Sequence, residues 1–150
     1  LATNPQSMVQ VTAVSPSFHQ MIVLQHKNPL FQDVRVRRAL SMALDRNLII
    51  QQVLGGGGVP DYPVPFSMMG LDRPLTLEEC GPYWQYNPQE AKRLLSEAGY
   101  PNGIEFSMMV PAPVSDVWLL VAEQWKQIGV RVRFDERESS VVCAAPFQKA

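Results

Sequence analysis

The sequence has little cysteine, no excess of charge of either sign and no long hydrophobic run. Its 150 residues include two cysteines, 13 basic and 14 acidic side chains, which gives a formal net charge of −1. This balance provides no electrostatic basis for binding nucleic acid or an anionic membrane surface. No apolar stretch approaches the roughly 20 residues that a membrane-spanning helix needs. Nor does the sequence show a basic segment followed by an apolar one, as a signal peptide would.

The few cysteines and histidines form no recognisable metal or catalytic pattern. Cys80 and Cys143 are far apart and neither lies in a CxxC pair, so neither a zinc site nor a thioredoxin-like motif is predicted. We interpret them as two unpaired thiols, and the sequence leaves a disulfide between them open. His19 and His26 are seven residues apart, which places them on opposite faces of a strand and favours surface or strand-end positions. We therefore predict no catalytic residue, no metal ligand and no cofactor, and no enzyme activity in this chain.

The overall composition favours one globular domain. Hydrophobic residues make up 46% of the chain and charged residues 18%, which is too apolar for a disordered protein. The chain begins at Leu1 rather than Met and ends inside a predicted helix over residues 141–150. We therefore expect residues 1–150 to form a single partial domain of a longer protein.

Hydrophobic periodicity predicts an alternation of strands and helices. Asp33 is a suitable N-cap for one helix, and Asp45 marks the restart of another that ends at the four glycines 55–58. Asn87 caps a third helix, which ends before Gly99. The other predicted elements are strands at 7–13, 19–25, 104–110 and 130–134 and a helix from Ser115 or Asp116 to Gln127. This order predicts an α/β domain.

The glycines at 55–58 invite comparison with a phosphate-binding loop. Such a loop follows a strand and leads into Lys-Ser or Lys-Thr at the start of a helix. Here the glycines follow a helix and precede Val59-Pro60. We interpret them as a helix end and a flexible connection.

The connection over residues 59–87 is rich in proline and aromatic residues, which predicts packing by its own side chains rather than disorder. Met68–Met69 lie within it, and Met108–Met109 end a predicted strand. We expect core packing for these methionines, with ligand contact as the alternative. Trp118 and Trp125 share one helix face, which indicates contacts with the core or with another lobe.

Several separated segments carry a family resemblance. Residues 28–45 read NPLFQDVRVRRALSMALD, and they are followed in order by VPDYPVPFSMMGLD, YNPQEAKRLLSEAGYPNGIEFSMMV and VAEQWKQIGVRVRF. These segments resemble the extracytoplasmic solute-binding proteins of peptide- and nickel-type ABC transporters, family 5 of the bacterial solute-binding proteins. The likeness covers roughly residues 15–132, and the joint order of the pieces makes it specific.

The resemblance implies a two-lobed type II binding protein that holds its ligand between the lobes. We expect this chain to be most of the C-terminal lobe, an α/β unit with a mixed sheet flanked by helices. The residues implied to face the ligand are Val110, Pro111, Ala112, Pro113 and Val114 after a strand, and Pro65, Phe66, Ser67, Met68 and Met69 in the long connection. Implied partners are a peptide or small-molecule ligand, the ABC permease subunits and the remaining lobe, in a periplasmic or extracytoplasmic location.

Two departures from the family pattern bear on the ligand. Dipeptide-type members can hold the ligand carboxylate with an arginine after the strand, whereas residues 111–115 here contain none. A bidentate carboxylate clamp needs that planar cation, so dipeptide specificity is in doubt. In addition, Gln25 stands where the family often has an asparagine.

Two functions of other classes stay open at this point. One is a ligand-sensing lobe of a transcription regulator, and the other is part of a hydrolase whose nucleophile lies outside this sequence. We also expect the isolated chain to associate with itself, because a lobe cut before its last elements exposes apolar surface or a strand edge.

Overall fold

The computed structural model describes residues 22–59 and 66–144, in which helical elements come first and a strand–helix–strand unit follows. In chain order the helices (α), short 3-10 helices (η) and strands (β) are η1 (Pro29–Phe31), α2 (Val34–Met42), α3 (Arg46–Leu54), η2 (Phe66–Met69), η3 (Pro82–Trp84), α4 (Pro88–Glu97), β1 (Ile104–Pro111), α5 (Asp116–Lys126), β2 (Val130–Arg137) and α6 (Ser139–Ala144). The expected α/β lobe, with helices beside a sheet, is confirmed.

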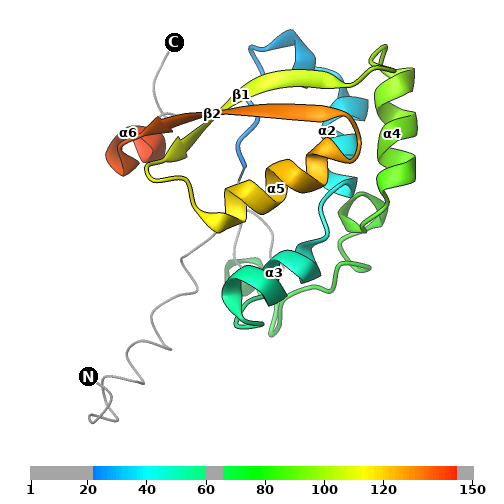
Figure 1. Ribbon diagram of the computed structural model, residues 1–150. Coiled ribbons are helices and arrows are strands. Elements are labelled where there is room, and N and C mark those ends of the chain that lie inside the picture. The colour runs from blue at the N-terminus through cyan, green and yellow to red at the C-terminus, as the bar shows by residue number, and fades with distance from the viewer. Residues whose placement is uncertain (1–21, 60–65, 145–150) are drawn as a thin grey trace.

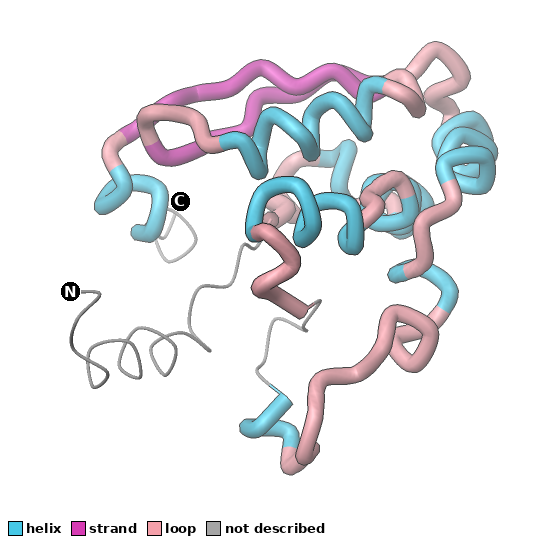
Figure 2. Tube along the Cα trace, turned by 60° about the horizontal axis from the view of Figure 1, so that its bottom comes forward, coloured by secondary structure: helices cyan, strands magenta, loops and turns pink. Residues whose placement is uncertain are grey.

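The sheet of the described residues consists of two parallel strands, β1 and β2, connected through α5. The register runs from Ile104 opposite Val130 to Pro111 opposite Arg137. Both ribbon views place α5 along one face of the strands (Figures 1 and 2). The resemblance implies a mixed sheet, with parallel and antiparallel strands. Because both described strands are parallel, the antiparallel part of that sheet stays a prediction.

Side chains of the strands alternate between the core and solvent. On β1, Ile104 and Val110 are buried, whereas Glu105 and Ser107 are exposed. On the exposed face, the Arg133 guanidinium forms an ion pair with Glu105. Parallel sheets are usually covered on both faces, so a charged outer face marks this sheet as covered on one side within the part described.

The core is organised around Trp125 of α5, which is 1% exposed. Its ring Nε1–H donates to the carbonyl oxygen of Leu40 in α2 at 2.9 Å. The ring also packs edge-on against Phe106 of β1 at 5.7 Å, and Phe106 meets Phe31 in the same way at 5.2 Å. Trp118 is 9% exposed, so the prediction that both tryptophans are core residues is confirmed.

Helix starts follow the predicted caps. The Asp33 carboxylate accepts from the N–H of Arg35 at 2.8 Å, and Asp45 accepts from the N–H of Leu48 at 2.9 Å. The Asn87 side chain does the same for the first turn of α4. The helix end predicted at the glycine run is also confirmed, because Gly55 ends α3 in the left-handed region with φ of 57°. The flexibility of the connection stays a prediction.

Some predicted boundaries differ from the structure. The strand expected at 19–25 is wrong for its described part, because residues 22–25 form no ladder with β1 or β2. A strand exists only through a hydrogen-bonded neighbour, which a local pattern cannot supply. The strand expected at 7–13 lies outside the described residues. The strand expected at 130–134 continues to Arg137, and α6 begins at Ser139 and is described as far as Ala144.

Two further expectations meet the limits of the described residues. The side chain of Cys143 lies outside them, so a disulfide with Cys80 stays open. Of the two histidines, His26 is exposed, as predicted, and His19 lies outside the described part. None of the helices in the described ranges is long and apolar enough to cross a membrane.

Candidate ligand-binding edge of the sheet

Both strands end at the same edge of the sheet, next to α6. We call residues 109–114 and 135–137 the carboxyl edge. In open α/β sheets, ligands bind beyond the carboxyl ends of parallel strands, where loops and helix starts leave backbone groups unpaired. The carboxyl edge contains one of the two segments that the sequence predicts to face a ligand.

Two hydrogen bonds fix the loop after β1 to the end of β2. The N–H of Ala112 donates to the carbonyl oxygen of Arg137 at 2.8 Å. The N–H of Val114 donates to Oε2 of Glu136 at 3.1 Å. The peptide bond between Ala112 and Pro113 is cis. The loop is therefore held in one conformation from both strands.

The predicted ligand residues of this loop differ in exposure. Val110 is 1% exposed and packs in the core, so its side chain offers no surface to a ligand. Pro111 and Val114 are half-buried, whereas Ala112 and Pro113 are exposed. The surface of the loop is thus small, apolar and rich in backbone groups.

The described cation at the carboxyl edge is engaged. Arg137 Nε donates to Oδ1 of Asp135 at 2.8 Å. Residues 111–115 contain no arginine. The loop after β1 therefore offers no guanidinium for a ligand carboxylate, and the Nε–H of Arg137 at the end of β2 is used by Asp135.

The second predicted segment lies on a part of the chain that projects from the lobe. We call residues 66–81 the arm, which leads from η2 to η3. Met68 and Met69 in η2 are 78% and 41% exposed, so the core packing expected for these two methionines is wrong. Phe66 is half-buried. Pro65 and the side chain of Ser67 lie outside the described residues. Figure 2 shows η2 at the lower tip of the molecule and the end of β1 at the upper left, so the two predicted segments do not converge.

The arm is closed by its own side chains. Arg73 donates to both carboxylate oxygens of Glu79, at 2.8 and 2.7 Å. The N–H of Thr76 donates to Glu79 at 2.8 Å. These contacts join residues 73–79 through polar side chains. The packing that the aromatic residues predict for the whole connection stays a prediction.

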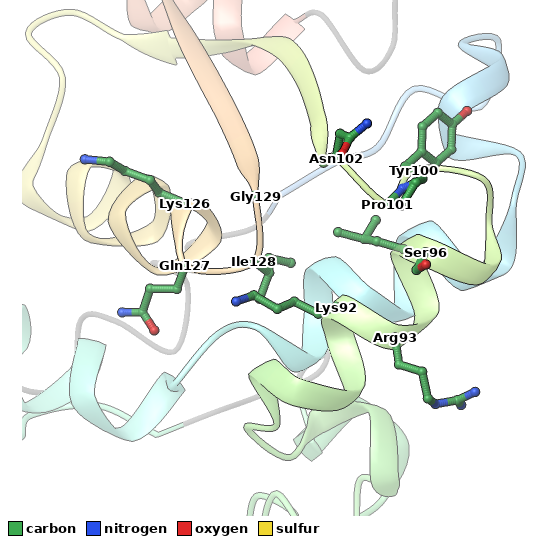
Figure 3. Close-up of a pocket in the computed structure, with 12 residues that line it drawn as sticks. Lys92, Arg93, Ser96, Tyr100, Pro101, Asn102, Lys126, Gln127, Ile128 and Gly129 are labelled. Atoms are coloured by element: carbon green, nitrogen blue, oxygen red, sulfur yellow. The ribbon is translucent and has the colours of Figure 1, made fainter.

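A cavity of about 650 Å³ lies at the opposite end of the sheet, between α4, the end of α5 and the turn before β1. Figure 3 shows Lys92 directed toward Gln127 and Ile128, and Arg93 directed away. Arg93 pairs with Glu90 and Glu97 on its own helix. The cavity borders the amino ends of the strands, where α/β folds do not usually bind ligands.

Sequence reasoning missed this cavity because its lining comes from three segments with no shared motif. Its polar residues are those of ordinary helix ends and turns, which carry no signal by themselves. Within the described ranges, no group of three or more His, Cys, Asp or Glu side chains could hold a metal ion.

Comparison with known proteins decides the family. Residues 2–149 match the family described as bacterial extracellular solute-binding proteins, family 5 Middle. The chain belongs to this family. The family resemblance found in the sequence is thereby confirmed. The fold of this chain also matches solved binding proteins, as the type II fold implied by the resemblance requires.

Relatives within family 5 are named as binding proteins. The oligopeptide-binding protein AppA of Bacillus subtilis is 35% identical over 122 residues, which cover 71% of this chain and 22% of AppA. The heme-binding protein A of Haemophilus influenzae is 36% identical over 110 residues, which cover 67% of this chain and 19% of that protein. The chain thus spans about a fifth of the length of these curated relatives.

Solved structures show the same fold. The structure of AppA in complex with a nonapeptide is 30% identical, with a TM-score of 0.60, and the match covers 79% of this chain and 26% of that one. DppA from Helicobacter pylori, an ABC transporter-associated periplasmic binding protein solved with the peptide STSA, has a TM-score of 0.68. It is 21% identical over 79% of this chain and 22% of its own, and supports the fold alone.

Proposed function

We propose that the protein carrying this chain captures a small solute, a peptide or peptide-like molecule, and delivers it to an ABC importer. The observation that carries the proposal is the family match over residues 2–149. Support comes from relatives named for binding oligopeptides and heme. Periplasmic or extracytoplasmic location, permease partners and absence of catalysis belong to the same proposal.

The proposed mechanism is closure of two lobes over the solute. Hinge closure buries a ligand between surfaces that are separately solvated in the open state. In this proposal residues 1–150 are most of the C-terminal lobe, and the carboxyl edge faces the cleft. Ala112 and Pro113 would contribute backbone groups and small apolar contacts, and Met68 and Met69 would contribute adaptable apolar surface.

The loop after β1 would not hold the solute's carboxylate through an arginine. Residues 111–115 contain none, and the Nε–H of Arg137 in β2 donates to Asp135 at 2.8 Å. Recognition there would rest on the carbonyl oxygens of the loop, because the N–H groups of Ala112 and Val114 are bonded to β2 and proline has none. Such bonds are independent of the side chains of a peptide. This arrangement favours broad peptide capture over selection of one dipeptide.

The test is a thermal-shift screen of the full-length protein that contains this sequence. The probes are a nonapeptide pool, reduced glutathione, haem, amino acids, sugars and nickel. Binding to the native state raises the melting temperature by mass action, so a shift with peptides is the expected result. A folded protein that shifts with none of the probes would contradict solute capture of this class.

Two matched tryptophan variants locate the site. Ala112→Trp places bulk on the carboxyl edge, and Ser96→Trp places the same bulk on an exposed residue lining the opposite cavity. We expect Ala112→Trp to weaken solute binding about tenfold or more, equivalent to ~1.4 kcal/mol. Ser96→Trp should bind as the wild type does. The reverse pattern would move the site to the cavity.

A further inference from the structure

Arg46 opens α3 directly after the helix restart, and its guanidinium is bound by main-chain oxygens rather than by an acid. Its Nη1 donates to the carbonyl oxygens of Ser41 and Trp84 at 3.1 and 3.0 Å, and its Nη2 donates to Oγ of Ser41 at 2.8 Å. The guanidinium also stacks over the Trp84 ring at 4.5 Å. Among the described residues, no carboxylate lies within ion-pair distance of Arg46.

This contact set is specific to arginine. A planar guanidinium can stack on an aromatic face and donate several hydrogen bonds in its own plane at the same time. A lysine ammonium offers three donors around one point and cannot reproduce both. Arg46 is half-buried, and burial lowers its pKa, so its stem and head are held within the fold rather than in solvent.

Arg46 is one of three contacts that fasten η3 to the end of α2. Oγ of Ser41, which accepts from Arg46, donates to the carbonyl oxygen of Tyr83 at 2.6 Å. The Arg38 guanidinium lies 4.1 Å from the centroid of the Tyr83 ring. Two arginines and one hydroxyl from α2 and α3 therefore bind two successive residues of η3.

The arm leaves the lobe at η3. At the end of the arm, η3 packs against α2, whereas η2 lies at the tip (Figure 2) and contains the exposed Met68 and Met69. Between them, the Arg73–Glu79 bridge closes residues 73–79 on themselves. At its η3 end, the direction of the arm is therefore set by the contacts that η3 makes with α2 and α3.

We propose that Arg46 is a positioning residue for solute capture, because by fixing η3 to α2 it sets where the arm carries Phe66–Met69. This inference rests on the proposed function, and assigns Arg46 no contact with the solute. An arginine beside a helix start, bound by main-chain oxygens and a tryptophan ring, thereby affects binding through the arm.

The experiment uses the full-length protein with Arg46→Lys and a matched control, Arg35→Lys. Arg35 also joins distant segments through a main-chain oxygen, since its Nη1 donates to the carbonyl oxygen of Glu97 at 2.6 Å, but it links α2 to α4 and not to the arm. Hydrogen exchange is followed in peptides covering residues 66–86 and in peptides covering α4. Affinity is measured for the nonapeptide pool, or for whichever screened probe gives the largest shift.

We expect Arg46→Lys to raise exchange in residues 66–86 about fivefold or more, because local opening follows the loss of anchoring contacts. It should weaken solute affinity by about the same factor, with exchange in α4 unchanged. Arg35→Lys should leave affinity within about twofold, as expected for a change outside the arm.

Three results for Arg46→Lys would overturn the inference. Hydrogen exchange in residues 66–86 could stay as in the wild type, or it could rise while solute affinity stays unchanged. It could also rise equally in α4, which would indicate a general loss of stability. If the wild type binds no probe, the proposed function fails and the positioning role fails with it. Faster hydrogen exchange of the arm in Arg46→Lys would then show only that the contacts of Arg46 hold η3 in place.

Discussion

At the scale of single residues, the Arg73–Glu79 bridge is the clearest electrostatic feature. The ionised Glu79 carboxylate accepts hydrogen bonds from the Arg73 guanidinium and from the N–H of Thr76. These donors favour the charged form, with the Arg73 side chain contributing most. They lower the pKa of Glu79 from its ordinary value of 4.5 to about 2.

The pH dependence of the arm follows from this shift. Because the pKa of Glu79 is lower in the folded protein, its contribution to the turn is fully present above pH 4.5 and is lost as pH falls through about 2. A ¹³C NMR titration should show the Glu79 carboxyl carbon titrating near pH 2, and Glu79→Gln should shift the Thr76 amide signal. Glu78→Gln, one residue away, should leave that signal in place. A Glu79 midpoint near 4.5 would show that the bridge does not persist in solution.

Residue roles that depend on near neighbours could be predicted from the sequence. Asp33, Asp45 and Asn87 act as caps because a cap needs only the residue itself and the three that follow. Arg46 stands beside Asp45 in the same stretch, yet its role could not be predicted. Its partner Trp84 lies 38 positions further along the chain, and nothing local indicates that contact.

At the scale of elements, the closest approach is between the two turns that lead into the strands. A Cβ on Gly103 would lie 1.9 Å from the carbonyl oxygen of Gly129, and Gly103 has φ of +85°. The backbones of the two turns pass at a distance that only glycine permits. This contact sets how β1 and β2 begin side by side.

Gly103→Ala should therefore be far more costly than another glycine substitution nearby. The clash with backbone has no side chain that can move aside, and we expect a loss of about 3 kcal/mol or more in the free energy of unfolding. Gly99→Ala is the matched control, because Gly99 also has a positive φ of +95° but nothing lies within 4 Å of its added Cβ. Its cost should be about 1 kcal/mol. Urea unfolding of the full-length variants measures both, and equal costs would argue against the close approach.

Helices and the β1–α5–β2 unit could be predicted because each contains its own periodic signal. The strand expected at 19–25 could not be corrected from sequence. Residues 22–24 do alternate in exposure in the structure, but they lack a ladder with β1 or β2. Alternation shows that a segment can be half-buried, and pairing decides whether it is a strand.

At the scale of the whole molecule, the order of several weak segments was enough to predict the family, because each constrains a different part of one fold. The site was harder. Its two predicted segments lie apart in the structure, and the chain spans about a fifth of the length of the relatives that it matches. The contribution of Val110–Val114 and Phe66–Met69 to binding stays a prediction for that reason.

The exposed apolar side chains of α3 predict how the isolated chain behaves. Helix α3 has no buried residue, and Leu48 and Leu54 on it are 39% and 47% exposed, next to Val59 at 60%. An apolar helix of this kind is normally covered, so the isolated chain should bury it by associating with itself. Sedimentation velocity at rising concentration should show species heavier than the 16.8 kDa monomer.

A charge on the apolar face should reverse the association, because a lysine buried without a partner is strongly disfavoured. Leu54→Lys should sediment as a monomer, whereas Val141→Lys on α6, where the residue is 44% exposed, should associate as the wild type does. In the full-length protein, Leu54→Lys should instead lower the melting temperature if the remaining chain covers α3. A wild-type chain that stays monomeric at every concentration would mean that α3 tolerates solvent. A covering segment elsewhere in the full-length protein would then not be required for α3.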